Sequence, residues 1–137
     1  MTTNTPDFNW VKALSDCSLT NVFESLRLQV KDDVETREAQ RPKTVQHQYY
    51  AFRFESKDRR FTAILNGHHI HEAVSFSLEQ KAIVVRDKHD AEIFSAITTL
   101  SDKRECRLKI KGQECELWQV RKMALEDLLF GGAEWNT

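Results

Sequence analysis

The fold is decided by residues 48–85, which read QYYAFRFESKDRRFTAILNGHHIHEAVSFSLEQKAIVV. Apolar and polar side chains alternate along most of this stretch, so Tyr50, Phe52 and Phe54 share one side of the chain. Alternation with a period of two is typical of strands that bury one face. Short polar breaks divide the stretch into four segments, at 56–59, 66–67 and 79–81. Because connections this short cannot carry a parallel crossover, the stretch predicts a four-stranded antiparallel meander.

The two middle strands are predicted to turn at 66–67, because Asn-Gly is typical of a type I′ hairpin. This turn would pair Ile64 with His69 and Thr62 with His71. The face toward the core would then carry Phe61, Ala63, Leu65, Ile70, Val74, Phe76 and Leu78. A helix over 68–79 remains an alternative, because three of its apolar residues also step by four.

The first third of the chain is predicted to be helical. Asp7 can cap a short helix whose apolar residues are Trp10, Val11 and Leu14. Ser18 or Thr20 can cap a longer helix, in which apolar residues recur at steps of three and four: Leu19, Val22, Phe23, Leu26, Val30 and Val34. Because proline disfavours helical backbone in the residue before it, this helix should end before Pro42.

Three further elements follow the meander. Residues 90–101 are predicted to be a helix, because Ile93, Phe94, Ile97 and Leu100 follow helical spacing, although two threonines also suit a strand. Residues 106–118 are predicted to be a hairpin, and 121–130 a helix that ends at Gly131. Beyond it, Trp135 would dock on the body, dock on a partner or be exposed.

The hairpin over 106–118 is predicted with Gly112-Gln113 as its two-residue loop. Lys109 would then face Glu116, and Arg107 would lie across the indole of Trp118. Apolar pairs, such as Ile110 with Cys115, would fall on the other face. A slip by one residue would break both sets of pairs, so the register is well specified.

The predicted fold class is α+β: a single domain in which an antiparallel sheet, a four-strand meander plus a C-terminal hairpin, has helices packed mainly on one face. The predicted order is α-ββββ-α-ββ-α. Residues 1–6 are expected to form a flexible N-terminus, and 7–137 one domain. The element order resembles that of the small α/β chaperones of bacterial secretion systems, although no motif carries this likeness.

Composition restricts the classes of function. The chain has 137 residues with 20 Lys and Arg against 21 Asp and Glu, so no global attraction to nucleic acid or anionic lipid is expected. The first residues lack the apolar run of a secretory signal, and no stretch approaches the ~20 apolar residues of a membrane span. We therefore expect a cytoplasmic protein with no membrane partner.

The three cysteines, Cys17, Cys106 and Cys115, are widely spaced and form no CxxC motif. An odd number in this pattern predicts free thiols in a reducing compartment. In the predicted hairpin, Cys106 and Cys115 share a face without being opposite, so a disulfide between them is not expected.

A histidine cluster at 68–71 offers the main candidate site. In the predicted hairpin, His69 and His71 share the face opposite the core, where two imidazoles at i and i+2 can reach one transition metal ion such as Zn. His89 is a candidate third ligand if the sheet brings it near. The alternative interpretation is an exposed polar hairpin that binds no metal. The sequence favours this alternative, because a metal site needs a third ligand and supporting contacts.

The sequence gives weaker evidence for other kinds of functional site. The chain contains no P-loop, GxGxxG, HExxH or GxSxG motif, and no catalytic residue is predicted. Basic residues gather at 57–60 and 103–111, and Tyr49, Tyr50 and Phe52 lie near the first group, a combination that can bind single-stranded nucleic acid. The balanced charge makes that partner unlikely on physical grounds.

The sequence therefore predicts a non-enzymatic cytosolic binding or adaptor protein that recognises another protein and can self-associate. The alternatives are a small metal-dependent enzyme or metal sensor that uses His69 and His71, and a single-stranded nucleic-acid binder. No cofactor is expected for the leading function.

Overall fold

The computed structural model describes residues 7–41 and 50–131 as three helices and one seven-stranded sheet. The helices are α1 (Trp10–Asp16), α2 (Leu19–Gln40) and α3 (Leu117–Phe130). The strands are β1 (Tyr50–Lys57), β2 (Arg60–Gly67), β3 (His71–Leu78), β4 (Ile83–Arg86), β5 (Glu92–Leu100), β6 (Cys106–Ile110) and β7 (Gln113–Cys115). Predictions for residues 1–6, 48–49 and 135 lie outside the described residues.

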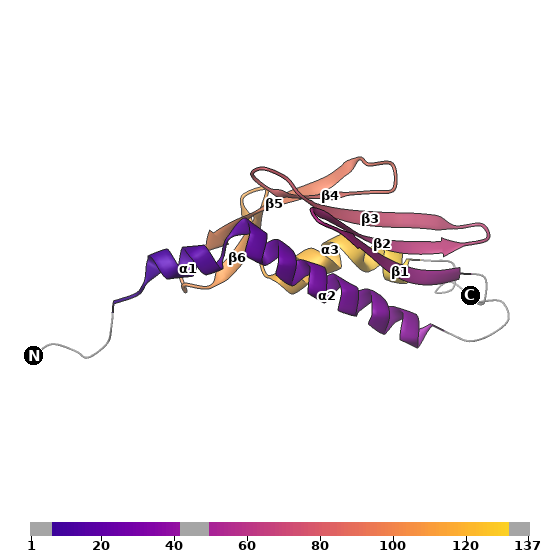
Figure 1. Ribbon diagram of the computed structural model, residues 1–137, viewed down its shortest axis with the longest axis horizontal. Coiled ribbons are helices and arrows are strands. Elements are labelled where there is room, and N and C mark those ends of the chain that lie inside the picture. The colour runs from indigo at the N-terminus through magenta and orange to yellow at the C-terminus, as the bar shows by residue number, and fades with distance from the viewer. Residues whose placement is uncertain (1–6, 42–49, 132–137) are drawn as a thin grey trace, which may run out of the picture.

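The sheet is one antiparallel meander in which the spatial order of the strands, β1 to β7, is their order along the chain. Helices α2 and α3 lie on the same side of this sheet (Figure 1). The α+β class, the antiparallel sheet and the packing of helices on one face are therefore confirmed. Within the described residues, no helix is both long and apolar enough to cross a membrane.

Helix α2 supplies much of the core. The hydroxyl of Ser18 accepts a hydrogen bond from the backbone N–H of Asn21 at 3.1 Å, so the predicted cap is confirmed. The predicted apolar stripe is buried against the sheet: Val22, Phe23, Leu26, Val30 and Val34. The stripe continues one step further, to a fully buried Arg37. The helix ends at Gln40, before the proline, as predicted.

The β2–β3 connection differs from the predicted two-residue turn. Strand β2 continues through residues 66–67, and β3 starts at His71, which pairs with Asn66. Ile64 pairs with Ala73 and not with His69, so the predicted register is wrong by four residues. Because four is an even number, every side chain that lies in β2 or β3 keeps its predicted face. The predicted inward set is accordingly buried or packed against the core, and 68–79 is not a helix.

Residues 90–101 are not a helix, and this prediction is wrong. They form strand β5, which pairs with β4 on one side and with β6 on the other. The first half of β5, up to Ala96, pairs with β4, and the second half, from Ile97, pairs with β6, so both halves have strand partners. Its β-branched residues Ile93, Ile97, Thr98 and Thr99 are stiff at χ1 and fit a sheet better than a helix. The observed order is therefore two helices, seven strands and one helix.

The C-terminal hairpin is confirmed, but its loop lies one residue earlier than predicted. Lys111 and Gly112 form the loop with φ values of 52° and 81°, the left-handed backbone of a type I′ turn. Lys109 consequently pairs with Glu114 instead of Glu116. Strand β7 is only three residues long, and α3 starts at Leu117, four residues before the predicted start. Trp118 thus belongs to α3 and not to the hairpin.

Helix α1 differs from the other two helices because none of its residues is buried. Its N-cap is Asn9, whose side chain accepts from the Lys12 N–H at 3.1 Å, and not the predicted Asp7. Its apolar residues are exposed: Trp10 by 60%, Val11 by 57% and Leu14 by 46%. The helix extends beyond the N-terminal end of α2 (Figure 1).

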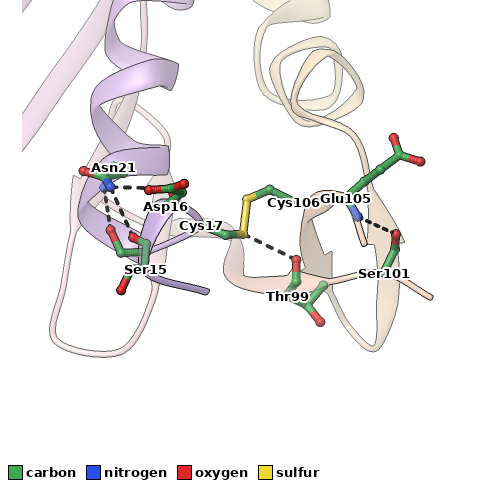
Figure 2. The surroundings of a disulfide bond; sticks show 9 residues. Ser15, Asp16, Cys17, Asn21, Thr99, Ser101, Glu105 and Cys106 are labelled. Atoms are coloured by element: carbon green, nitrogen blue, oxygen red, sulfur yellow. Dashed lines mark hydrogen bonds between the residues drawn. A yellow bond between two sulfur atoms is a disulfide. The ribbon is translucent and has the colours of Figure 1, made fainter. Parts of the chain in front are cut away.

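Two of the three cysteines form a disulfide, so the prediction of free thiols is wrong for them. Cys17 lies between α1 and α2, and it is bonded to Cys106 at the start of β6, with a Cα–Cα distance of 5.5 Å (Figure 2). The two residues are 89 positions apart, a distance at which sequence spacing gives no signal of pairing. Cys115 is a free, buried thiol, and it is not bonded to Cys106, as predicted.

Side chains of α2 occupy backbone groups at two places along the outer edge of β1. Glu38 accepts a hydrogen bond from the Phe52 backbone N–H at 3.0 Å. Toward the other end of the strand, the Arg27 guanidinium donates to the carbonyls of Lys57 and Asp58 at 2.6 and 2.8 Å. Occupied edge groups oppose the addition of a further strand, so β1 is a poor site for pairing with another chain.

Candidate functional site

The structure places the two predicted metal ligands in different elements. His69 lies in the turn between β2 and β3 beside His68, with ring centroids 6.1 Å apart, while His71 is the first residue of β3. The two-ligand geometry depended on a register that placed both rings on one strand face. Because the strands end at 67 and resume at 71, only His71 projects from the sheet.

The turn between β4 and β5, which contains His89, does reach the start of β3. The residue that makes this contact is Lys88, whose ammonium donates to the His71 carbonyl at 3.0 Å and to Glu72 at 2.9 Å. No group of three or more His, Cys, Asp or Glu able to hold a metal occurs among the described residues. The predicted Zn site stays a prediction, and metal analysis of the purified protein tests it directly.

The residues behind the nucleic-acid alternative are largely engaged in the fold. Phe52 is buried, and Tyr50 packs against the core, while Tyr49 lies outside the described residues. Arg60 pairs with Asp90 at 3.1 Å. The rings of Tyr50 and Phe52 therefore pack within the fold, where they are not free to stack on bases.

A cleft between α2 and α3 is a candidate site. Its volume is about 540 Å³, within the range of ligand and peptide pockets. Helix α2 contributes residues from its second half, including Asp33, Thr36 and Arg37, and α3 contributes residues along its whole length. Half-exposed aromatic residues mark the ends of the α3 wall: Trp118, 52% exposed, and Phe130, 49% exposed.

The floor of the cleft is apolar and rigid. Leu125 and Leu129 project into it from α3 and are 2% and 6% exposed. Arg37 is buried beside them, with its guanidinium 4.9 Å from the ring centroid of Phe52 and 5.0 Å from that of Phe130. Its Nε donates to the Leu129 carbonyl at 2.8 Å, at the C-terminal end of α3, where a cation is favourable. These contacts fix the aromatic end of the cleft.

An ion pair spans the other end. One nitrogen of the Arg121 guanidinium on α3 donates to both carboxylate oxygens of Asp33 on α2, at 2.9 and 3.0 Å. Burial raises the pKa of the Asp33 carboxyl, and the charge of Arg121 offsets part of this rise. The Arg121 Nε is buried without a hydrogen-bond partner. The pair therefore joins the two helices at this end of the cleft.

Trp118 is held in place by neighbouring charges. Its indole N–H donates to Glu116 at 3.1 Å, and Glu116 also pairs with Arg107 of β6 at 2.7 Å. Two hydrogen bonds lower the pKa of the Glu116 carboxyl: the one from Arg107, which has the larger effect, and the one from Trp118. This chain of contacts replaces the predicted stacking of Arg107 on the indole, and it connects the cleft to the sheet.

The cleft combines apolar surface with charged groups of both signs. Its charged lining groups balance, with Arg37, Arg121 and Lys122 against Asp32, Asp33 and Glu126. Lys122 and Glu126 also pair with each other at 3.2 Å. The described lining residues include neither a histidine nor a cysteine. Apolar surface framed by paired charges can bind an amphipathic segment, whose apolar side chains would cover the floor.

The sequence prediction did not include this site. Arg37 follows Val34 by three residues, so it continues the apolar stripe of α2. A charged residue at such a position was the available sign of this site in the sequence. Trp118 was predicted in a strand, which hid its place on α3. The contact between Asp33 and Arg121 joins residues 88 positions apart, and one sequence gives no sign of it.

Comparison with known proteins gave no match: no family model, no curated protein and no solved structure matches the chain.

Proposed function

We propose that the protein is a non-enzymatic binding or adaptor protein, and that the α2–α3 cleft holds an amphipathic segment of a partner protein. The observation that supports this most is the cleft itself, which combines an apolar floor with a half-exposed aromatic residue at each end of its α3 wall. Aromatic residues beside an apolar pocket are the usual anchors of protein recognition.

The shape of the cleft favours a helical or short extended guest. Two helices already form its walls, and a third helix can lay an apolar face between them, with anchors at steps of three and four. The paired charges at the rim can bond to polar groups of the guest. Strand addition is a weaker option, because α2 occupies groups on the edge of β1.

A library of displayed peptides tests the proposal without knowledge of the partner. We expect selected peptides to carry two or more apolar side chains on one helical face and to bind the wild-type protein. The variant with Thr36→Arg and Trp118→Ser, which fills the cleft and removes an anchor at exposed positions, should bind them at least tenfold more weakly.

The matched control is Lys12→Gln with Asp16→Asn, which alters exposed charged residues on α1 and leaves the cleft intact. It should bind the selected peptides as the wild type does. Peptides that bind the wild type, the control and the cleft variant equally well would contradict the proposal. A library that yields no binder would also contradict it.

We also propose a cytoplasmic location. In a reducing cytoplasm, a disulfide such as Cys17–Cys106 is formed only in part or transiently. Trapping of thiols in intact cells by acid quenching, followed by mass spectrometry, tests this. We expect a mixture of reduced and bonded pairs, and a fully bonded pair would indicate an oxidising compartment instead.

A further inference from the structure

Helix α1 presents an apolar face that the described residues leave about half exposed. At 100° per residue, Trp10, Leu14 and Val11 fall within about 100° of one another around the helix. Lys12 and Asp16 lie on the opposite side, where they pair at 2.8 Å. The helix is thus amphipathic, yet its apolar face is the exposed one.

Isolated helices of this length are unstable in water, because seven residues cannot repay the cost of nucleation. The Asn21 side chain of α2 donates to the Ser15 and Asp16 carbonyls at the end of α1, and two further contacts hold its start. Asn9 caps its first turn, and the guanidinium of Arg104 lies 4.6 Å from the ring centroid of Phe8 just before it. None of these contacts covers Trp10 or Leu14, so a surface that buries them would complete the packing.

That surface cannot be the cleft of the same chain. Only residues 17–18 join α1 to α2, and Cys17 is fixed to Cys106 on β6. The cleft begins at Asp32, which is roughly 20 Å along α2 at 1.5 Å per residue. Because α1 extends away from this part of α2 (Figure 1), it cannot turn back to it while the disulfide is intact.

The cleft and the α1 face match in size and charge. Helix α1 is about 10 Å long, and the α2 wall from Asp32 to Gln40 spans about 12 Å. Lys12 and Asp16 neutralise each other on α1, as Asp33 and Arg121 do beside the cleft. Apolar contact would therefore decide the fit, with Trp10 and Leu14 against Leu125 and Leu129.

We infer that the occupant of the cleft is helix α1 of a second copy of this chain. This inference rests on the proposed function, because it names the guest of the same cleft. Each copy gives a helix and offers a cleft, so the contact is head-to-tail and copies can join into a ring or an open chain. One short helix buries less area than a standard interface, so we expect weak association, in the micromolar to millimolar range.

A mixing experiment tests this inference by sedimentation velocity on the full-length protein. One variant carries Trp10→Glu and Leu14→Glu and keeps its cleft; the other carries Thr36→Arg and Trp118→Ser and keeps α1. All four positions are exposed or line the cleft, and circular dichroism with urea denaturation verifies that each variant folds. The control with Lys12→Gln and Asp16→Asn should associate as the wild type does.

The wild type should exceed the monomer mass of 16.0 kDa as its concentration rises, whereas each variant alone should stay monomeric. An equimolar mixture of the two variants should give a dimer and nothing larger, because one partner lacks the helix and the other lacks the cleft. Self-association of the cleft variant alone would show that α1 pairs with α1, and would overturn the inference. A monomeric wild type at every concentration would also overturn it.

The outcome separates this inference from the proposed function. If selected peptides bind the cleft and the variant mixture stays monomeric, the cleft recognises another protein and α1 is not its guest. If the mixture forms the dimer, occupancy of the cleft by α1 is established whether or not library peptides bind.

Discussion

Helices α1 and α3 each carry a half-exposed tryptophan near their N-terminus, but the two helices differ in how they are held. Helix α3 buries five residues against the sheet and α2: Val120, Ala124, Leu125, Leu128 and Leu129. Helix α1 buries none. Trp118 therefore lies at the rim of a wall that is packed in place, whereas Trp10 belongs to a helix whose apolar face the described residues leave about half exposed. A similar exposed fraction of a tryptophan thus marks the rim of the candidate cleft in α3. In α1 it marks the apolar face that we propose binds a second copy.

The largest effect that separates the two helices should come from truncating a leucine in each. Leu128→Ala on α3 should lower the free energy of unfolding by about 2–5 kcal/mol, because it leaves a cavity in the core. Leu14→Ala on α1 should change it by less than about 0.5 kcal/mol in dilute solution. Urea denaturation at low protein concentration measures both. Equal losses would mean that α1 is packed as firmly as α3.

Removal of the disulfide should loosen α1 and leave α3 in place. Cys17→Ser with Cys106→Ser should cost about 2–4 kcal/mol in urea denaturation under oxidising conditions, because the bond closes a long loop of the unfolded chain. The fluorescence anisotropy of Trp10 should fall more than that of Trp118, measured in variants that keep one tryptophan each. Reductant should destabilise the wild type but not the serine variant, and equal sensitivity of the two would contradict this account.

Arg121→Ala should have a smaller effect, confined to the contact between α2 and α3. It should cost about 1–3 kcal/mol at neutral pH, because it leaves the half-buried Asp33 carboxylate without its partner. Burial holds the pKa of Asp33 above its ordinary value, so this carboxylate takes up a proton as the pH falls through that raised pKa.

The difference between the wild type and Arg121→Ala should therefore shrink on acidification, as urea denaturation across a pH series would measure. A second change, Asp33→Asn in the Arg121→Ala background, should restore part of the loss at neutral pH. A loss that is independent of pH, or one that Asp33→Asn deepens, would mean that the stranded carboxylate is not its cause.

The smallest effect concerns the environment of Trp118. Because the pKa of Glu116 is lowered, its bonds to Arg107 and Trp118 should persist at mildly acidic pH and be lost only as the pH falls through a value below that of an ordinary glutamate. A variant with Trp10→Phe and Trp135→Phe leaves Trp118 as the single fluorophore of the three. Its emission should shift at that pH, and Glu116→Gln should abolish the shift.

Side-chain periodicity predicted the faces of the strands better than it predicted their partners. Both hairpin registers differ from the predicted ones by an even number of residues, so Phe61 and Leu108 point inward as the alternation requires. The conformation of the turn residues determined which residues pair across the strands. Gly67 forms part of β2, and Lys111 adopts the left-handed backbone that the prediction had assigned to other positions.

The residues that were predicted wrongly depend on distant contacts. Strand β5 has helical spacing of its apolar residues, but β4 pairs with its first half and β6 with its second half, and these partners determine its structure. Cys17 meets Cys106 only because the α1–α2 junction lies beside β5, where the Cys17 sulfur lies 3.5 Å from the Thr99 carbonyl (Figure 2). The cleft likewise exists only once α2 and α3 are packed together.

The most direct test of the central claim is an NMR titration between the two complementary variants. The ¹⁵N-labelled protein carries Trp10→Glu and Leu14→Glu, so it offers a cleft but no competent α1, and the unlabelled titrant carries Thr36→Arg and Trp118→Ser. We predict saturable shifts that are concentrated on the amides around Arg37, Trp118 and Leu125 and on the Trp118 indole. Absence of shifts at high titrant concentration, or shifts centred on α1 or on the open face of the sheet, would contradict the claim that α1 of one copy fills the cleft of another.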